Sequence, residues 1–216
     1  MHWLLHDPLA RWLVAGSAVA LVLGEVGATY LGQARDGRRR PLGSMAESLL
    51  YARRRDGAPT QDRGTLWVIV LASRVGLVAA LLIAARAPAL RAGADDWWTL
   101  GVGVALVLAG VGLRVWAIVT LGRHFRRQVT IEEGQTLVRR GPYRLLRHPS
   151  YAGLLLAFAG LGLALGSWVS AAVAALTLFL GLLPRIRVEE RALARAFGSD
   201  YEDYASHTDR VLPHVW

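Results

Sequence analysis

The sequence contains no cysteine and no lysine, and only 19% of its 216 residues are charged. Without cysteine there can be no disulfide, no thiolate metal site and no cysteine nucleophile. Without lysine, a Schiff-base enzyme and the phosphate-binding lysine of a P-loop are excluded. Soluble proteins are about 25% charged, whereas here the hydrophobic residues, 54% of the total, fall in long runs. The composition therefore excludes an ordinary soluble domain and predicts a membrane protein.

Long apolar runs predict the membrane-spanning helices. A helix needs about 20 apolar residues to cross a hydrocarbon core about 30 Å thick, and three runs have that length. These runs are residues 9–31, 66–85 and 98–121. A fourth run, residues 152–184, carries no charge but is interrupted by Gly166 and Ser167, which predicts a helical hairpin. We therefore expect an all-α, multi-pass membrane protein with three transmembrane helices and a C-terminal hairpin, five spans in all.

Arginine is concentrated in two of the connecting segments. Segment 33–64 carries 8 Arg and 4 acidic residues, and segment 122–150 carries 7 Arg and 2 acidic residues. Short cytoplasmic loops carry the excess of basic residues, so we expect both segments in the cytoplasm. The N-terminus is then outside and the C-terminus is cytoplasmic. The chain divides into an N-terminal membrane region, residues 1–121 with the basic loop, and a region 122–216 that includes the hairpin.

Some polar residues and glycines lie inside the predicted spans. Glu25, Arg74 and Arg114 lie at similar depths, about 9 to 12 Å from the predicted cytoplasmic ends of their helices. Charges at such depth face a partner or a water-filled cavity, which leaves two interpretations: an ion-pair cluster between helices, or the polar floor of a cavity. The glycines of segments 101–103 and 160–166 predict close helix packing and not a dinucleotide-binding loop.

The most distinctive polar sequence stands between the third span and the hairpin. Residues 134–151 contain two Tyr, one His and four Arg, and they are interrupted by Pro142 and Pro149. Each proline removes a backbone donor and disfavours helix at the preceding residue, which predicts a shaped loop. After the hairpin, residues 185–198 have helical composition, include a pair of glutamates and end at a glycine suited to a C-cap. Both ends of a hairpin lie at one membrane surface, so the two segments should form a polar site open to the bilayer.

Seven motifs follow one another in the C-terminal part of the chain. They are Leu137-Val138, Gly141-Pro142-Tyr143, Arg147-His148-Pro149-Ser150-Tyr151, the apolar hairpin, Glu189-Glu190, Phe197-Gly198 and Tyr201-x-x-Tyr204. In this pattern, over about residues 121–213, the chain resembles the isoprenylcysteine carboxyl methyltransferase family, and membrane phospholipid methyltransferases share the C-terminal part of the pattern. The resemblance implies an integral membrane enzyme that moves a methyl group from S-adenosylmethionine to a lipophilic acceptor. It also makes region 122–216 the catalytic part.

The resemblance implies site residues by matching motif positions. The cofactor would be held at the cytosolic surface by the loop before the hairpin and by the helix after it. The matching residues are Gln128, Gln135, Thr136, Leu137, Val138, Tyr143, His148, Pro149, Ser150, Tyr151 and Glu189. Gln135 departs from the family, which commonly has His there. Arg185 matches a family arginine that engages the substrate, and Glu190 is the candidate base if the acceptor is an amine. We expect no metal site, because His124 and His207 lack ligand partners at recognisable spacing.

The first hypothesis for the reaction is carboxyl O-methylation of an isoprenylcysteine-like substrate. The second is N-methylation of a phospholipid or another amine. Membrane sterol reductases that use NADPH share the architecture, but they have Gly-Trp-Trp in place of Gly141-Pro142-Tyr143 and lack the paired glutamates. A non-enzymatic membrane scaffold would have no use for the His-Pro and Glu-Glu motifs. The expected partners are a lipophilic or prenylated substrate and membrane lipids, with no nucleic acid.

Overall fold

The computed structural model of the chain describes residues 8–10, 12–20, 23, 64–86, 96–122, 136–213 and 216. Within these residues the regular structure is helical, as expected for an all-α protein. The elements are α4 (Thr65–Arg86), α5 (Asp96–Leu121), the 3-10 turn η3 (Gly141–Arg144), α6 (Pro149–Ala164), α7 (Trp168–Phe197) and α8 (Ser199–Ser206). Residues 8–10 and 12–20 are also helical. Leu146 and Asp209 form an isolated β-bridge.

Three of these helices are long and apolar enough to cross a membrane. They are Thr65–Arg86, Trp97–Leu121 and Trp168–Phe197. At 1.5 Å per residue, the 22 residues of α4 extend about 33 Å, which exceeds the hydrocarbon thickness. Helix α6 has 16 residues and extends about 24 Å, so it is shorter. The predicted spans 66–85 and 98–121 are confirmed as helices, and about half of the predicted span 9–31 lies outside the described residues.

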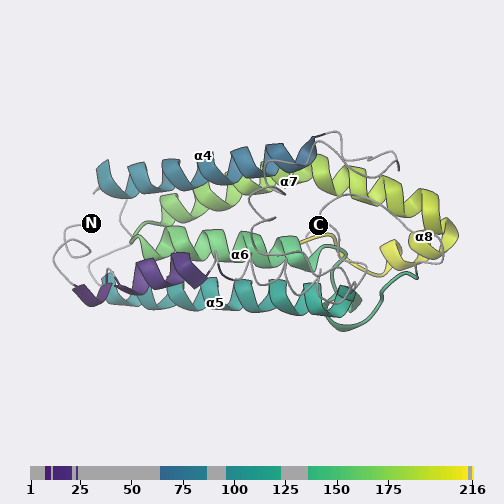
Figure 1. Ribbon diagram of the computed structural model, residues 1–216, viewed down its shortest axis with the longest axis horizontal. Coiled ribbons are helices and arrows are strands. Elements are labelled where there is room, and N and C mark those ends of the chain that lie inside the picture. The colour runs from purple at the N-terminus through teal and green to yellow at the C-terminus, as the bar shows by residue number, and fades with distance from the viewer. Residues whose placement is uncertain are drawn as a thin grey trace, which may run out of the picture.

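The long helices lie side by side in a bundle (Figure 1). Helices α5 and α6 approach closely because glycines face each other across their interface. A Cβ atom on Gly160 would lie 2.7 Å from the carbonyl oxygen of Gly103, and one on Gly110 would meet the carbonyl oxygen of Gly153. Small residues allow such backbone contact between membrane helices. The prediction that these glycines pack helices is confirmed for Gly103 and Gly160.

The hairpin turns where the sequence predicts. Gly166 has a φ of 79°, a conformation that glycine adopts without steric cost. Ser167 caps the next helix by accepting a hydrogen bond from the backbone N–H of Ser170 at 3.2 Å. The hydroxyl of Ser170 donates to the carbonyl oxygen of Ala80 at 2.9 Å and so connects α7 to α4. The turn is therefore specified by two adjacent residues and stabilised by packing against α4.

Helix α7 continues past the end of the predicted hairpin. Pro184 lies inside it, and the helix runs to Phe197, where Gly198 with a φ of 51° forms the C-cap. The predicted helical segment 185–198 is thus not a separate element. A proline inside a helix loses one backbone hydrogen bond, yet here α4 packs closely along the preceding turn, where a Cβ on Gly181 would meet the side chain of Ala72. As a result, α7 is a single helix that contains both the apolar second half of the hairpin and the paired glutamates.

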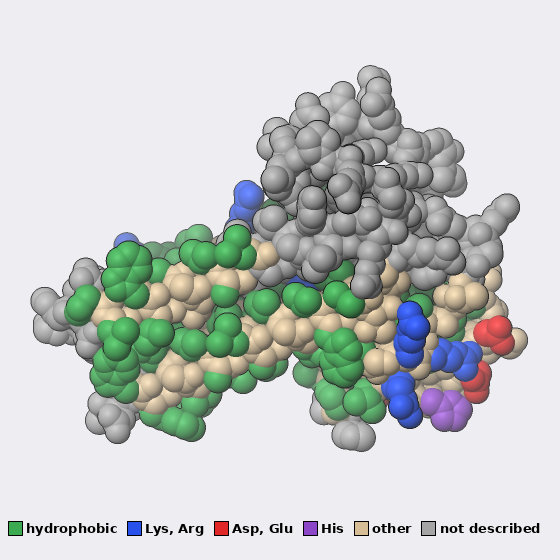
Figure 2. Space-filling view, turned by 60° about the horizontal axis from the view of Figure 1, so that its bottom comes forward, with side chains coloured by type: hydrophobic (Ala, Val, Ile, Leu, Met, Phe, Trp, Pro, Cys, Tyr) green, Lys and Arg blue, Asp and Glu red, His purple; other side chains and the backbone are tan. Residues whose placement is uncertain are grey.

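Polar and apolar side chains separate along the bundle. Figure 2 shows hydrophobic side chains over its long part and arginine, acidic and histidine side chains gathered at one end. Large side chains such as Trp67, Leu71 and Trp116 are more than half exposed on α4 and α5, as expected for surfaces that contact lipid. The charged end contains the loop before α6, the end of α7, and α8.

Candidate active site

The loop that leads into α6 is shaped by its prolines and by the C-terminal tail. Pro142 lies in the first turn of η3 and Pro149 begins α6, as the sequence predicts for this interrupted segment. The backbone N–H of Arg147 donates to the carbonyl oxygen of Asp209 at 2.7 Å, and that of His148 donates to Arg210 at 2.8 Å. The tail therefore fixes the position of His148, the N-cap residue of α6.

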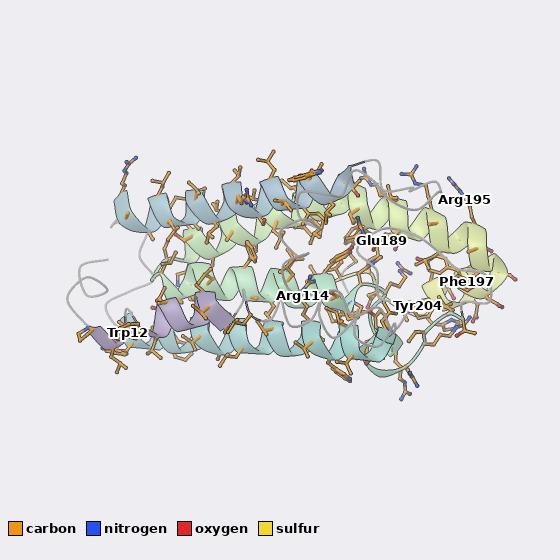
Figure 3. All side chains as sticks on the ribbon, viewed as in Figure 1. Trp12, Arg114, Glu189, Arg195, Phe197 and Tyr204 are labelled. Atoms are coloured by element: carbon orange, nitrogen blue, oxygen red, sulfur yellow. The ribbon has the colours of Figure 1, made fainter. Side chains whose placement is uncertain are left out.

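Glu189 on α7 is the centre of a compact polar cluster. The hydroxyl of Tyr151 donates to its Oε1 atom at 2.6 Å, and Nε of Arg185 donates to the same atom at 2.7 Å. Nδ1 of His148 lies 3.4 Å from Oε2. The rings of His148 and Tyr151 are stacked, with their centroids 5.5 Å apart. The predicted adjacency of the loop and the later part of α7 is therefore confirmed (Figure 3).

Glu190 points to the other side of His148 and has a different set of partners. Nε of Arg210 lies 3.0 Å from both of its carboxylate oxygens, and Nε of Arg147 lies 3.2 Å from Oε1. Nε2 of His148 lies 3.6 Å from Oε1. The imidazole of His148 is therefore placed between two adjacent carboxylates.

This position affects the charge of His148. Burial by itself lowers the pKa of the imidazole, because the charged form loses its hydration. The neighbouring carboxylates of Glu189 and Glu190 outweigh that effect and raise the pKa of His148 above its ordinary value. The imidazole therefore favours the protonated form, in which both ring nitrogens can donate to the glutamates.

Two further contacts attach the site to its surroundings. Arg114 on α5 donates from one terminal nitrogen to the hydroxyl of Ser150 at 2.7 Å and to its carbonyl oxygen at 3.1 Å. Tyr204 on α8 donates to the carbonyl oxygen of Tyr143 at 2.8 Å. The intramembrane Arg114 therefore anchors the start of α6. Arg74 is exposed on α4, and Glu25 lies outside the described residues.

The structure brings together part of the predicted site. His148, Tyr151, Arg185, Glu189 and Glu190 form the two clusters described above. Tyr143, Pro149 and Ser150 are buried next to them at the start of α6, Thr136 is exposed, and Leu137 and Val138 are half-buried. Within the described residues, no hydrogen bond or ion pair joins segment 136–138 to the glutamates. Gln128 and Gln135 lie outside the described residues.

Sequence reasoning did not identify the two arginines that hold Glu190. Arg147 stands within the quoted motif, next to His148, but its type alone did not distinguish it from the other arginines of the loop. Arg210 belongs to no quoted motif. Its placement depends on the tail folding back onto the loop, which no local pattern in the sequence indicates.

Comparison with known proteins bears on the same region. Residues 103–195 match the sequence model of the isoprenylcysteine carboxyl methyltransferase (ICMT) family. Protein-S-isoprenylcysteine O-methyltransferase B of Arabidopsis thaliana is 36% identical over 123 residues, which are 56% of this chain and 62% of that protein. Protein-S-isoprenylcysteine O-methyltransferase of Rattus norvegicus is 33% identical over 120 residues, 55% of this chain and 42% of that protein. The matched region thus spans about three fifths of the plant relative's length.

A solved structure has a similar fold. The structure of the eukaryotic intramembrane Ras methyltransferase ICMT covers 97% of this chain, and this chain covers 69% of it, with a TM-score of 0.68 and 23% sequence identity. At that identity the likeness shows the fold alone. With the three long apolar helices, the shared fold makes the chain an integral membrane protein. Over residues 103–195, the chain is therefore similar in sequence to the isoprenylcysteine carboxyl methyltransferase family.

Proposed function

We propose that the chain is a membrane methyltransferase that moves a methyl group from S-adenosylmethionine to the carboxyl group of an isoprenylcysteine-like acceptor. The observation that carries the proposal is the Glu189 carboxylate, held by Tyr151 and Arg185 beside a membrane-crossing helix, inside the segment that matches the family. The names of the plant and rat relatives, both protein-S-isoprenylcysteine O-methyltransferases, support the same reaction.

The residues around Glu189 fit the cofactor. S-adenosylmethionine has a positive sulfonium, hydroxyl groups and an aromatic base. Glu189 offers carboxylate oxygens, and the stacked rings of His148 and Tyr151 offer an aromatic surface. We therefore assign binding to these three residues. The other residues assigned to the cofactor are Gln128, Gln135, Thr136, Leu137, Val138, Tyr143, Pro149 and Ser150.

The chemistry asks the protein mainly for positioning. When bound, S-adenosylmethionine supplies a methyl group on a sulfonium, which is an activated leaving group. Arg185 is 3% exposed and presents a guanidinium group beside Glu189, where a charge-assisted hydrogen bond would orient the carboxylate of the acceptor. A carboxylate has no proton to lose, so the transfer needs no general base. Holding the acceptor near attack distance provides the rate increase.

Methylation of an amine would make a further demand. A proton must leave the amine, and Glu190 is the candidate base. Arg210 and Arg147 contact the oxygens of Glu190 at 3.0 to 3.2 Å. These guanidinium groups compete for the lone pairs that would accept the proton. The arrangement therefore favours carboxyl O-methylation over N-methylation.

We also propose the topology that the arginine distribution predicts. Five spans, formed by residues 9–31, α4, α5, α6 and α7, place the N-terminus outside and the site and C-terminus in the cytoplasm. The cofactor then arrives from the cytosol, and the lipid part of the acceptor enters sideways from the bilayer, between helices.

The experiment that tests the function uses the purified chain in detergent. It is incubated with methyl-labelled S-adenosylmethionine, a farnesylcysteine analogue and a lipid extract containing phosphatidylethanolamine, and the products are treated with base. We expect the label to be released as volatile methanol, because carboxyl methyl esters hydrolyse in base. Base-stable label in the lipid fraction would show that the enzyme methylates an amine and not a carboxyl group. Absence of labelled product with either acceptor would contradict the proposal.

A further inference from the structure

A pocket lies on the Glu190 side of His148, away from the Glu189 cluster. It has a volume of about 610 Å³, within the range of small-ligand sites. Its polar lining is Arg147, Arg187, Glu190, Arg191, Tyr201 and Arg210. Four arginines and one carboxylate give the lining a formal excess of three positive charges. A pocket of this charge suits an anion.

The arginines of this pocket fall into two pairs. Arg147 and Arg210 share the Glu190 carboxylate. Arg187 and Arg191 are exposed on α7, and within the described residues no carboxylate forms an ion pair with either. They are four residues apart, and like charges at that spacing on a helix repel each other. An anion bound between them would remove this repulsion.

Tyr201 supplies a second and independent sign of a ligand. Tyr201 is only 5% exposed, and it lines the same pocket. Its hydroxyl is buried and has no hydrogen-bond partner within the described residues. A buried hydroxyl without a partner is costly. A ligand oxygen in the pocket would accept its hydrogen bond.

The position along α7 indicates the source of the anion. The apolar part of this membrane-crossing helix ends at Leu183. Arg187 follows four residues later, about 6 Å along the helix axis. That distance corresponds to the headgroup layer, where anionic lipids attract arginine by about 1 kcal/mol for each side chain. Guanidinium groups and a phenol hydroxyl are suitable donors to phosphate oxygens.

We propose that this pocket binds a phosphate group, and that an anionic phospholipid of the surrounding membrane supplies it. Arg187 and Arg191 hold the phosphate at the mouth, and the hydroxyl of Tyr201 donates to it from the inner wall. Arg187, Arg191 and Tyr201 are not among the residues assigned to the cofactor or the acceptor, so the test does not depend on methyl transfer.

The test is calorimetric titration of the purified chain in neutral detergent. The probes are short-chain phosphatidylglycerol, short-chain phosphatidylcholine and inorganic phosphate. We expect saturable binding of phosphatidylglycerol, with inorganic phosphate weaker and phosphatidylcholine weaker still. Equal binding of phosphatidylglycerol and phosphatidylcholine would overturn the anion site. Phosphate binding as tightly as phosphatidylglycerol would overturn the lipid as its source.

Matched variants locate the site. The double variant Arg187→Gln/Arg191→Gln should weaken phosphatidylglycerol binding at least about tenfold, since each charged hydrogen bond contributes that much. The control Arg144→Gln/Arg195→Gln removes the same charge from exposed positions that do not line the pocket and should change affinity less than about twofold. Figure 3 shows Arg195 on the outer side of α7. An equal loss in the control would mean general charge attraction and would overturn the proposal.

Tyr201→Phe keeps the net charge and the packing of the ring, and it removes only the hydroxyl. We expect a loss of about tenfold in phosphatidylglycerol affinity, with the fold intact because the hydroxyl has no partner within the described residues. Thermal melting of each variant verifies the fold. Unchanged affinity in Tyr201→Phe would remove Tyr201 from the site, and unchanged affinity in both this variant and the arginine double variant would overturn the proposal.

Discussion

The apolar bundle and the polar end of this protein are held together in different ways. In the apolar bundle, formed by α4, α5, α6 and the first part of α7, glycines such as Gly103 and Gly160 allow helices to touch along their backbones. In the polar end, formed by the loop, the last turns of α7 and α8, the contacts are ion pairs and hydrogen bonds around Glu189 and Glu190. Helix α7 belongs to both regions. The packing of the bundle therefore fixes the position of Glu189 and Glu190, and the ion pairs and hydrogen bonds of the polar end fix the orientation of their carboxylates.

The largest expected effect separates chemistry from stability at the polar end. Glu189→Gln removes the carboxylate charge that is assigned to the cofactor, and loss of one partner of a buried, hydrogen-bonded charge pair costs about 3 kcal/mol of binding free energy. We therefore expect kcat/KM to fall by at least about a hundredfold. The base-labile methyl assay measures the change.

The matched control for that variant is Glu202→Gln, since Glu202 is exposed on α8. It should keep activity within about twofold. If both variants lost activity equally, the assignment of Glu189 would be wrong.

A substitution in the apolar bundle should show the opposite pattern. A Cβ atom on Gly160 would lie 2.7 Å from the Gly103 carbonyl oxygen, so Gly160→Ala forces α5 and α6 apart. We expect the free energy of unfolding to fall by about 1 to 3 kcal/mol, while the Glu189 contacts stay intact. Denaturant titration measures the change. Gly112→Ala, where no atom lies within 4 Å of the added Cβ, should be neutral or stabilising, and equal losses in the two variants would contradict the close packing.

The smallest expected effect is a pH dependence at the polar end. Because the folded state raises the pKa of His148, protonated His148 stabilises the fold. This stabilisation is complete below the ordinary imidazole pKa of about 6.5 and is lost as the pH rises through the raised value. Melting temperature should therefore fall with pH above about 6.5, and His148→Gln should flatten that slope. His207→Gln, at an exposed position, should leave the slope unchanged. If His207→Gln flattened the slope and His148→Gln did not, the assignment of the pH dependence to His148 would be wrong.

The helices were predictable because membrane burial leaves a strong signal. Runs 66–85 and 98–121 are helices within a few residues of the predicted ends, and the interruption at Gly166 and Ser167 is the turn of the hairpin. A backbone in hydrocarbon must satisfy its own hydrogen bonds, so length and apolarity nearly suffice to predict a helix. Pro184 was misleading because local rules end a helix at proline, whereas packing against α4 carries α7 through it.

The polar end was predictable in part. The adjacency of His148 to Glu189 follows from the hairpin, and the motif positions identified both residues. The partners of Glu190 did not follow, because Arg210 is 20 positions away along the chain and reaches the carboxylate only when the tail pairs with Arg147 and His148. No periodic pattern in the sequence predicts this pairing between the tail and the loop.

The sequence by itself determined that the chain is helical and membrane-embedded, and which polar segments the hairpin brings together, because hydrophobic burial depends on composition summed over about 20 residues. Only the tertiary structure decided that the adjacent residues Glu189 and Glu190 lie near different ring nitrogens of His148. The reason is physical: ion pairs and hydrogen bonds act over about 3 Å, so their partners are set by how distant segments fold together and not by local sequence.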